Sequence, residues 1–177
     1  MNNNGTLNNY GVFRGDGGAF SGTYTDSGTL SPGGENDSIG VLTFFGDLTK
    51  ETGSTEIQLA GLFDGGGQRK DTLFDWFEVS GDVSLSGTLD VEVWGGFEFA
   101  DRDYFRVIRV GGTLSGQFDG LGEGGLVGEY EGENLFITYA GGDGNDVVLY
   151  VNSIPEPNST TLLILLAGLG MTVRRRL

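Results

Sequence analysis

Residues 83–93 read Val-Ser-Leu-Ser-Gly-Thr-Leu-Asp-Val-Glu-Val, and this stretch decides the fold class. Apolar side chains occupy every second position, and Gly87 stands at the one place where the apolar series is interrupted. A strand places successive side chains on opposite faces, whereas a helix requires apolar residues three and four positions apart. The stretch therefore predicts a β-strand with one buried face and one solvated face.

Short segments of the same kind recur along the chain, and clusters of glycine separate them. The further strand candidates are Ile39–Phe45, Glu56–Leu62, Thr72–Val79, Tyr104–Val110, Leu135–Tyr139 and Val147–Val151. No segment before Pro155 carries a convincing helical period, so the sequence predicts an all-β fold. Many short strands at near-regular spacing fit two architectures, a β-solenoid and a β-sandwich or barrel.

A degenerate repeat favours the solenoid. The tripeptide Gly-Thr-Leu occurs four times, beginning at Gly5, Gly28, Gly87 and Gly112. Ser-Gly followed by a strand-like pair recurs five times, beginning at Ser21, Ser27, Ser80, Ser86 and Ser115. Each rung of a solenoid needs tight corners, which glycine provides because it tolerates positive φ. We therefore predict a Gly-rich β-solenoid-like domain over residues 1–153, with a β-sandwich as the alternative for residues 35–153.

Several of these stretches are similar to a known group of proteins. Those that begin at Gly28, Ile39, Val79 and Gly112 resemble the β-helical passenger regions of autotransporter-type surface proteins. The resemblance extends over roughly residues 1–151 and implies a right-handed parallel β-helix. The large translocating β-barrel of true autotransporters has no counterpart in these 177 residues, so the resemblance does not imply that route of export.

The composition excludes several classes of function. The formal net charge is −15, and the part before Pro155 carries −17, so the surface repels nucleic acid phosphates and anionic lipid. Histidine and cysteine are both absent from the sequence, which rules out a Ser-His-Asp triad, a histidine zinc site and a disulfide. We expect a protein that is not an enzyme and has no nucleic acid partner.

Clustered carboxylates leave one catalytic alternative open. Acids such as Asp119 and Glu123 could act as acid and base in a polysaccharide-processing β-helix protein. Trp76 and Trp94 could provide platforms for sugar rings. A tryptophan in a small β-protein is more often part of the core, so this reading ranks below a non-enzymatic one.

One short motif is typical of calcium sites. Residues 141–149, Gly-Gly-Asp-Gly-Asn-Asp-Val-Val-Leu, fit the nonapeptide of calcium-binding β-rolls. Carboxylates on tight glycine turns suit a hard cation, so Asp143 and Asp146 are the candidate Ca²⁺ ligands. Calcium in such rolls is shared between successive turns, and this motif occurs once. The alternative is a polar hairpin that joins the strands Leu135–Tyr139 and Val147–Val151.

The last 24 residues differ from everything before them. A Pro155-Glu156-Pro157 breaker is followed by a Ser/Thr spacer, an uncharged apolar run over residues 160–173, and Arg174-Arg175-Arg176. As a helix the run would extend over ~21 Å, against ~30 Å for the hydrocarbon core of a bilayer. The arginines would hold that end in the cytoplasm and leave the body outside. We expect a single C-terminal transmembrane helix over residues 160–173.

The order of these parts resembles the PEP-CTERM sorting signal over residues 154–177. The resemblance implies export, transient retention in the inner membrane, and processing near Pro155 by an exosortase, a membrane transpeptidase-like enzyme. Such proteins belong to Gram-negative-type bacteria that make exopolysaccharide. Residues 155–157 would then be recognised by the processing enzyme, and a matrix exopolysaccharide is a further expected partner.

These expectations combine into one functional hypothesis. We expect an exported, non-enzymatic protein of the cell surface or extracellular matrix, with a calcium-binding or polysaccharide-processing β-helix protein as the alternative. Proteins with this sorting signal also carry a signal peptide, whereas Met1–Tyr10 is polar and has neither a basic nor an apolar region. We therefore expect the natural start of the protein to lie upstream of Met1.

Overall fold

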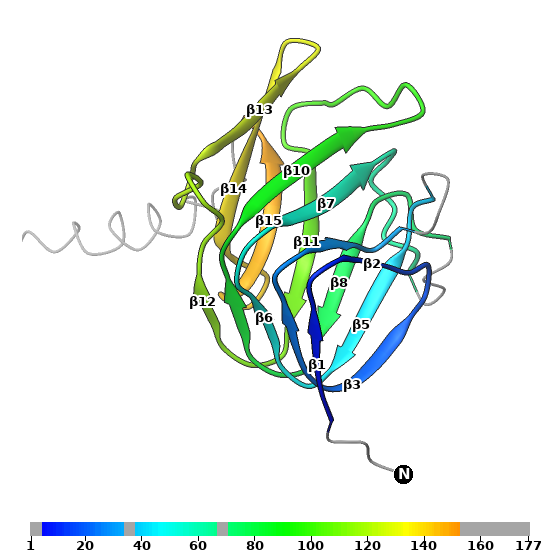
Figure 1. Ribbon diagram of the computed structural model, residues 1–177. Coiled ribbons are helices and arrows are strands. Elements are labelled where there is room, and N and C mark those ends of the chain that lie inside the picture. Colours follow the sequence, from blue (N-terminus) through cyan, green and yellow to red (C-terminus); the bar gives the residue numbers. More distant parts are fainter. Residues whose placement is uncertain (1–4, 34–37, 67–70, 153–177) are drawn as a thin grey trace, which may run out of the picture.

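The computed structural model describes residues 5–33, 38–66 and 71–152, and this part of the chain is all-β. Figure 1 shows its strands in chain order. They are β1 (Gly5–Asn9), β2 (Val12–Arg14), β3 (Ala19–Asp26), β4 (Thr29–Ser31), β5 (Val41–Phe45), β6 (Leu48–Lys50), β7 (Ser54–Leu59), β8 (Trp76–Val79), β9 (Val83–Leu85), β10 (Thr88–Val93), β11 (Tyr104–Val110), β12 (Leu114–Gly116), β13 (Leu126–Tyr130), β14 (Glu133–Gly141) and β15 (Asp146–Val151).

The strands form two sheets of unequal size. The smaller sheet has the order β10-β7-β4-β2, and all of its pairs are parallel. The larger sheet has the order β12-β9-β6-β3-β5-β8-β11-β15-β14-β13, with β1 also paired to β3. From β12 through to β11 neighbouring strands are parallel, and β1 is parallel to β3. The pairs β11–β15, β15–β14 and β14–β13 are antiparallel. Extensive parallel pairing differs from the antiparallel sheets of a β-sandwich.

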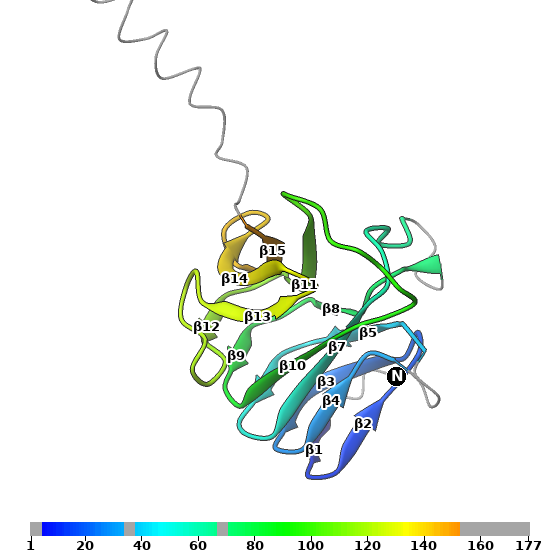
Figure 2. The same ribbon diagram turned by 90° about the horizontal axis from the view of Figure 1, so that it is seen from above.

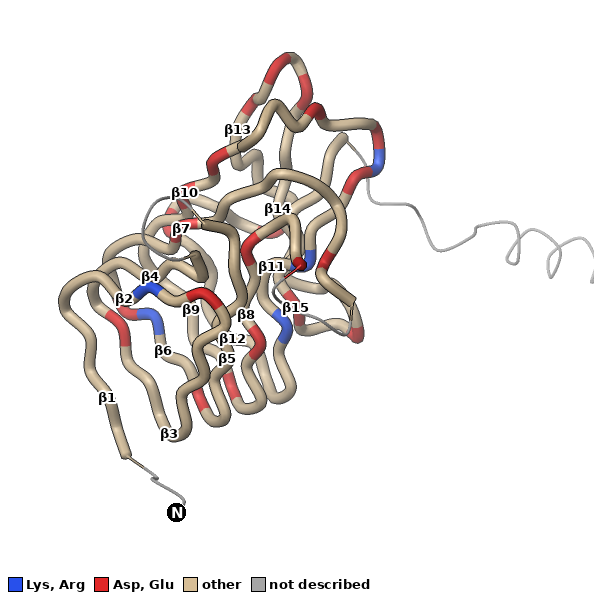
Figure 3. The backbone as a smooth tube through the Cα atoms, turned by 90° about the vertical axis from the view of Figure 1, so that its right-hand side faces the viewer, with Lys and Arg blue, Asp and Glu red and all other residues tan. Residues whose placement is uncertain are grey.

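The chain passes repeatedly from the larger sheet to the smaller one. The segments β3–β4, β6–β7 and β9–β10 each cross at a short corner, and each lies beside the segment before it. Figures 2 and 3 show the result as a series of loops laid side by side. We call each loop a coil. At the C-terminal side the antiparallel strands β13, β14 and β15 follow the last coil and lie across that end.

The stretch that predicts one strand, residues 83–93, is two strands in the structure. β9 belongs to the larger sheet and β10 to the smaller one. Gly87 lies between them with φ +76°, a conformation that favours glycine and turns the chain through the corner. The alternation of buried and exposed residues continues on both sides of the corner because each strand keeps its apolar side chains inside the coil.

Two ladders of glycine run along the corners and explain the repeated tripeptides. One contains Gly5, Gly22, Gly46, Gly81 and Gly112, and the other contains Gly11, Gly28, Gly53 and Gly87. A Cβ atom on Gly28 would lie 1.9 Å from the carbonyl oxygen of Gly11, and one on Gly53 would lie 2.0 Å from that of Gly28. Successive coils therefore approach too closely at these corners for any side chain.

Apolar rows inside the coils form the core. Tyr24 pairs in register with Leu7 and Leu48, and Leu48 pairs with Val83, so one inward position repeats from coil to coil. The ring of Tyr24 lies 5.0 Å from that of Phe44 between ring centroids. Aromatic rings such as Phe44, Phe77 and Phe105 pack there among buried leucine, isoleucine and valine side chains, so the core of this glycine-rich chain combines aromatic and aliphatic residues.

A buried ion pair lies in the same interior. Lys50 and Asp26 are neighbours on β6 and β3, and their side chains are 1% and 0% exposed. Lys50 Nζ binds the Asp26 carboxylate and also donates to the carbonyl of Gly28 at 2.6 Å. Asn9 Nδ2 donates to the other Asp26 oxygen. Every charge in this group thus has a partner, which a buried ion pair requires to be tolerated.

The predicted sorting segment, residues 154–177 with its transmembrane helix 160–173, lies outside the described residues. Within the described ranges there is no helix long and apolar enough to cross a membrane. The last described residue, Asn152, directly follows β15.

Candidate functional site

The structure places the two candidate calcium ligands in different environments. Residues 142–145 form the turn of the β14–β15 hairpin, as in the alternative to a calcium site, and Asp143 lies exposed on that turn. Asp146 is the first residue of β15 and is fully buried. The two residues are therefore close in sequence, but one side chain lies at the surface and the other lies in the interior.

Asp146 is engaged by protein groups. Its Oδ2 forms an ion pair with Arg106 of β11, and its Oδ1 accepts a hydrogen bond of 2.8 Å from the N–H of Val110. Among the described residues no group of three or more acidic side chains is arranged to hold a metal ion. The geometry gives Asp146 a structural role in fastening β15 to β11, and the calcium site stays a prediction from the sequence.

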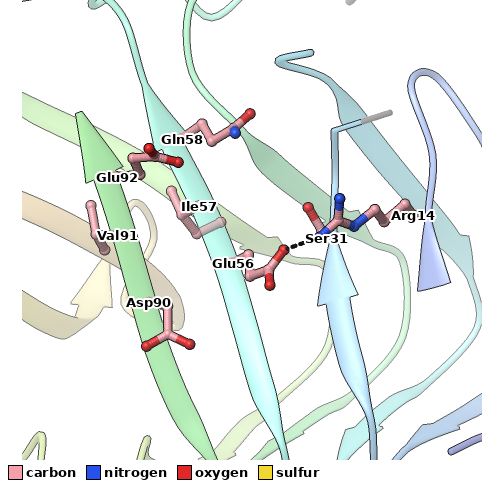
Figure 4. A pocket seen from close by; sticks show the side chains of 8 residues that line it. All are labelled: Arg14, Ser31, Glu56, Ile57, Gln58, Asp90, Val91 and Glu92. Carbon is pink, nitrogen blue, oxygen red and sulfur yellow. Dashed lines mark hydrogen bonds and ion pairs between the residues drawn. The ribbon is translucent and has the colours of Figure 1, made fainter. Parts of the chain in front are cut away.

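A pocket on the outer surface of β2, β4, β7 and β10 is lined mainly by their outward polar side chains, and we call it the polar face. Figure 4 shows how its lining residues lie. They are Arg14, Ser31, Glu56, Ile57, Gln58, Asp90, Val91 and Glu92. The polar members come from alternate positions of parallel strands, so the coil-to-coil register places them side by side.

Register and charge decide what the polar face can do. Asp90 lies beside Glu56, and Glu92 lies beside Gln58. Like charges on neighbouring strands repel, and Arg14 relieves this at one point, since its Nη2 lies 2.9 Å from Glu56 Oε2. The result is a mainly acidic surface of carboxylate and amide oxygens, which can accept hydrogen bonds from the hydroxyl groups of a sugar chain.

A second surface feature lies on the antiparallel end of the larger sheet. Tyr104 pairs in register with Tyr150, Tyr150 with Phe136, and Phe136 with Leu126, so four apolar side chains form one row across β11, β15, β14 and β13. We call it the exposed row. Tyr104 is 61% exposed and Leu126 is 52% exposed. The neighbouring residues of the same strands, such as Phe105 and Leu149, are fully buried, so the row points outward.

The exposed row has the properties of a binding platform. The rings of Phe136 and Tyr150 are stacked, with centroids 5.7 Å apart. Three strand spacings of ~4.8 Å give the row a length of ~14 Å. Partial burial raises the pKa of the Tyr150 phenol, and the nearby Glu123 carboxylate adds to the increase. A phenolic hydroxyl can both donate and accept a hydrogen bond. Stacked aromatic rings with a hydroxyl group at the edge suit the face of a sugar ring.

Of the tryptophans considered as sugar platforms, Trp76 is 2% exposed and belongs to the core. The guanidinium of Arg109 lies 3.8 Å from the centre of its ring, and Arg109 Nη2 binds Asp64 Oδ2 at 2.7 Å.

The residues that do form an exposed row were missed because they come from four separate strands. Only the register places them together, although Tyr104, Phe136 and Tyr150 each stand at an outward position of a predicted strand.

No family model matches this sequence, and comparison with the curated proteins and with the solved structures gives no significant match for the chain.

Proposed function

We propose that this chain is an exported, non-enzymatic component of the cell surface or extracellular matrix of a Gram-negative-type bacterium. A C-terminal signal sorts it and an exosortase processes it. The single observation that carries this proposal is the order of parts in residues 154–177: the Pro155-Glu156-Pro157 breaker, the apolar run and the three arginines. That segment follows directly on the strand that ends the body, so a cut near Pro155 would leave every described strand in place.

The body serves this function as a right-handed parallel β-helix. Parallel pairing between coils and the two glycine ladders support that classification. The handedness rests on a general rule, since connections between parallel strands of one sheet are right-handed in nearly all proteins. A rigid stack of coils is a structural element that presents the same positions repeatedly along its length.

Mass spectrometry of the mature protein from its host tests the sorting proposal. We expect a C-terminus near Pro155 in the wild type and an intact Leu177 when Pro155-Glu156-Pro157 is replaced by three alanines. Replacing Asn158-Ser159 by alanines is the matched control, because it alters the spacer and keeps the breaker. An intact Leu177 in a cytoplasmic wild-type protein would overturn the proposal.

We further propose that the exposed row contacts a neutral matrix polysaccharide. The acidic charge of the body opposes polyanionic ligands, whereas the faces of uncharged pyranose rings can pack on Tyr104, Tyr150 and Phe136. Affinity electrophoresis in gels that contain the host exopolysaccharide provides the test. We expect Tyr104→Ala to lose most of the retardation and Phe45→Ala, which removes an aromatic ring of similar exposure from β5, to keep it. Equal retardation of both variants and the wild type would refute this contact.

A further inference from the structure

An amine, a carboxylate and a carboxamide from three neighbouring coils meet in the interior of the stack. Asn9 of β1, Asp26 of β3 and Lys50 of β6 occupy the same register position of three adjacent parallel strands. The Asp26 and Lys50 side chains are buried, and Asn9 is partly buried. The hydroxyl of Tyr24 lies 3.4 Å from Asp26 Oδ1. The three polar groups therefore face one another in a place largely shielded from water.

The Asp26 carboxylate connects the other two groups. Its Oδ2 accepts a hydrogen bond from Lys50 Nζ, and its Oδ1 accepts one of 2.5 Å from Asn9 Nδ2. The nitrogen of the amine and the nitrogen of the carboxamide are thus both held on one acid–base group. A carboxylate in this position can take a proton from the amine and give it to the amide nitrogen.

The carboxamide of Asn9 is also held at its carbonyl oxygen. The N–H of Gly11 donates to Asn9 Oδ1 at 3.2 Å, and Asn9 Nδ2 donates to the carbonyl of Gly11 at 3.2 Å. These two hydrogen bonds fix the plane of the carboxamide. A backbone N–H on a carbonyl oxygen stabilises the negative charge that develops there when a nucleophile attacks the carbon. Asn9 is therefore oriented and polarised as an electrophile.

The side chain of Lys50 is long enough to reach Asn9. Two strand spacings of ~4.8 Å place the Cα atoms of these residues ~10 Å apart. An amide between the two side chains would contain about eight bonds of ~1.5 Å between those Cα atoms, so it can extend over that separation. Nζ already lies at Asp26, the residue between them in the row.

We propose that Lys50 and Asn9 form an intramolecular isopeptide bond, with Asp26 as the acid–base group. The buried ion pair starts the reaction, because transfer of one proton from the ammonium to the carboxylate leaves two neutral groups. The free amine then attacks Cγ of Asn9, so that the Cγ–Nζ bond forms and the Cγ–Nδ2 bond breaks.

The protons of this reaction balance within the three residues. Nζ loses two protons, and Asp26 passes both of them to the departing nitrogen, which leaves as ammonium. Asp26 ends as a carboxylate, and no oxidant or other reactant is consumed. The bond would tie the coil of β1 to the coil of β6 across the coil of β3. It is independent of the proposed sorting and polysaccharide binding.

Mass spectrometry of the purified full-length chain tests the bond. We expect an intact mass that is lower than the mass of the sequence by one ammonia molecule. Trypsin should then release residues 1–14 linked to residues 15–69, because a lysine acylated at Nζ is not cut. Loss of one water molecule would place the bond on Asp26 instead of Asn9. That result, like an unchanged mass, would overturn the proposal.

Single substitutions separate this bond from other losses of ammonia. Lys50→Arg keeps a cation beside Asp26 and removes the nucleophile, and Asn9→Ala removes the electrophile, so both variants should retain the full mass of their sequences. Asn8→Ala is the matched control, since Asn8 lies exposed on the same strand, and this variant should still lose ammonia. An asparagine that cyclises onto its own backbone would also lose ammonia in Lys50→Arg, and that outcome would contradict the bond.

Asp26→Asn tests the acid–base role. An asparagine has nearly the shape of the aspartate but does not transfer protons, so this chain should fold with Lys50 and Asn9 unlinked. Circular dichroism shows whether each variant keeps the fold. If Asp26→Asn does not fold, Asn9→Ala, which leaves the buried ion pair intact, still decides whether the bond exists. A linked Asp26→Asn chain would refute the role of Asp26.

Discussion

Replacing Gly53 by alanine is expected to destabilise the protein strongly, and Gly120 provides a matched control. The two glycines have φ values of +75° and +76°, so alanine suffers the same backbone strain of about 1–2 kcal/mol at either position. They differ in their surroundings. A Cβ atom on Gly53 would lie 2.0 Å from the carbonyl oxygen of Gly28, whereas one on Gly120 would meet nothing within 4 Å.

The carbonyl of Gly28 cannot retreat without breaking other contacts. It accepts hydrogen bonds from the N–H of Ser54 at 3.1 Å and from Lys50 Nζ at 2.6 Å. A neutral hydrogen bond contributes about 1 kcal/mol and one to a charged group about 1.5–3 kcal/mol. Loss or weakening of both adds to the backbone strain, so Gly53→Ala should cost about 3–6 kcal/mol and Gly120→Ala about 1–2 kcal/mol.

Urea denaturation followed by circular dichroism measures both free energies of unfolding. Gly53→Ala should lower the midpoint far more than Gly120→Ala, with Gly120→Ala leaving the slope unchanged. If Gly53→Ala is too unstable to purify, Gly53→Ala in a background stabilised by an osmolyte gives the same comparison. Equal losses of stability at the two positions would refute the reasoning that close approach of coils, and not backbone φ alone, requires glycine at these corners.

Two further predictions concern buried charges. Lys50→Met leaves the Asp26 carboxylate buried without its cation and should lower the free energy of unfolding, measured by urea denaturation, by about 3–5 kcal/mol. Arg14→Met, in the exposed pair with Glu56, should lower it by under about 1 kcal/mol. Similar losses in the two variants would contradict the larger role of the buried pair. Burial raises the pKa of Asp75 from 3.8 to about 7, although N–H groups of Gly40 and Gln58 donate to its oxygens. Because the folded state then binds the proton more tightly, the stabilising contribution is complete below about pH 4 and is lost as the pH rises through 7, by up to about 1.4 kcal/mol for each pH unit. Stability measured between pH 5 and pH 8 should therefore fall less steeply with pH in Asp75→Asn than in the wild type, and parallel curves would contradict the shift.

The sequence-based reading of the strands succeeded where burial on one face dominates. Tyr104–Val110 has the predicted bounds, and the predicted segments Leu135–Tyr139 and Val147–Val151 lie within β14 and β15. The prediction of one strand over residues 83–93 was wrong at Gly87, where the chain turns a corner between two strands. The alternation of apolar and polar residues continues through this corner, so the polarity pattern does not reveal it. It also missed Lys50 as an interior residue, since a buried lysine is recognisable only from the carboxylate and carbonyl placed beside it by neighbouring coils.

The sequence by itself determined the all-β class, the acidic surface, the exclusion of histidine and cysteine chemistry, and the ordered motif of residues 154–177. Each of these is a property of composition or of neighbours in the chain, so no spatial information is needed to read it. The tertiary structure decided which glycines face a carbonyl, which acids lie side by side on the polar face, and which apolar residues form the exposed row. These depend on register between residues 10 or more positions apart, which local periodicity does not specify.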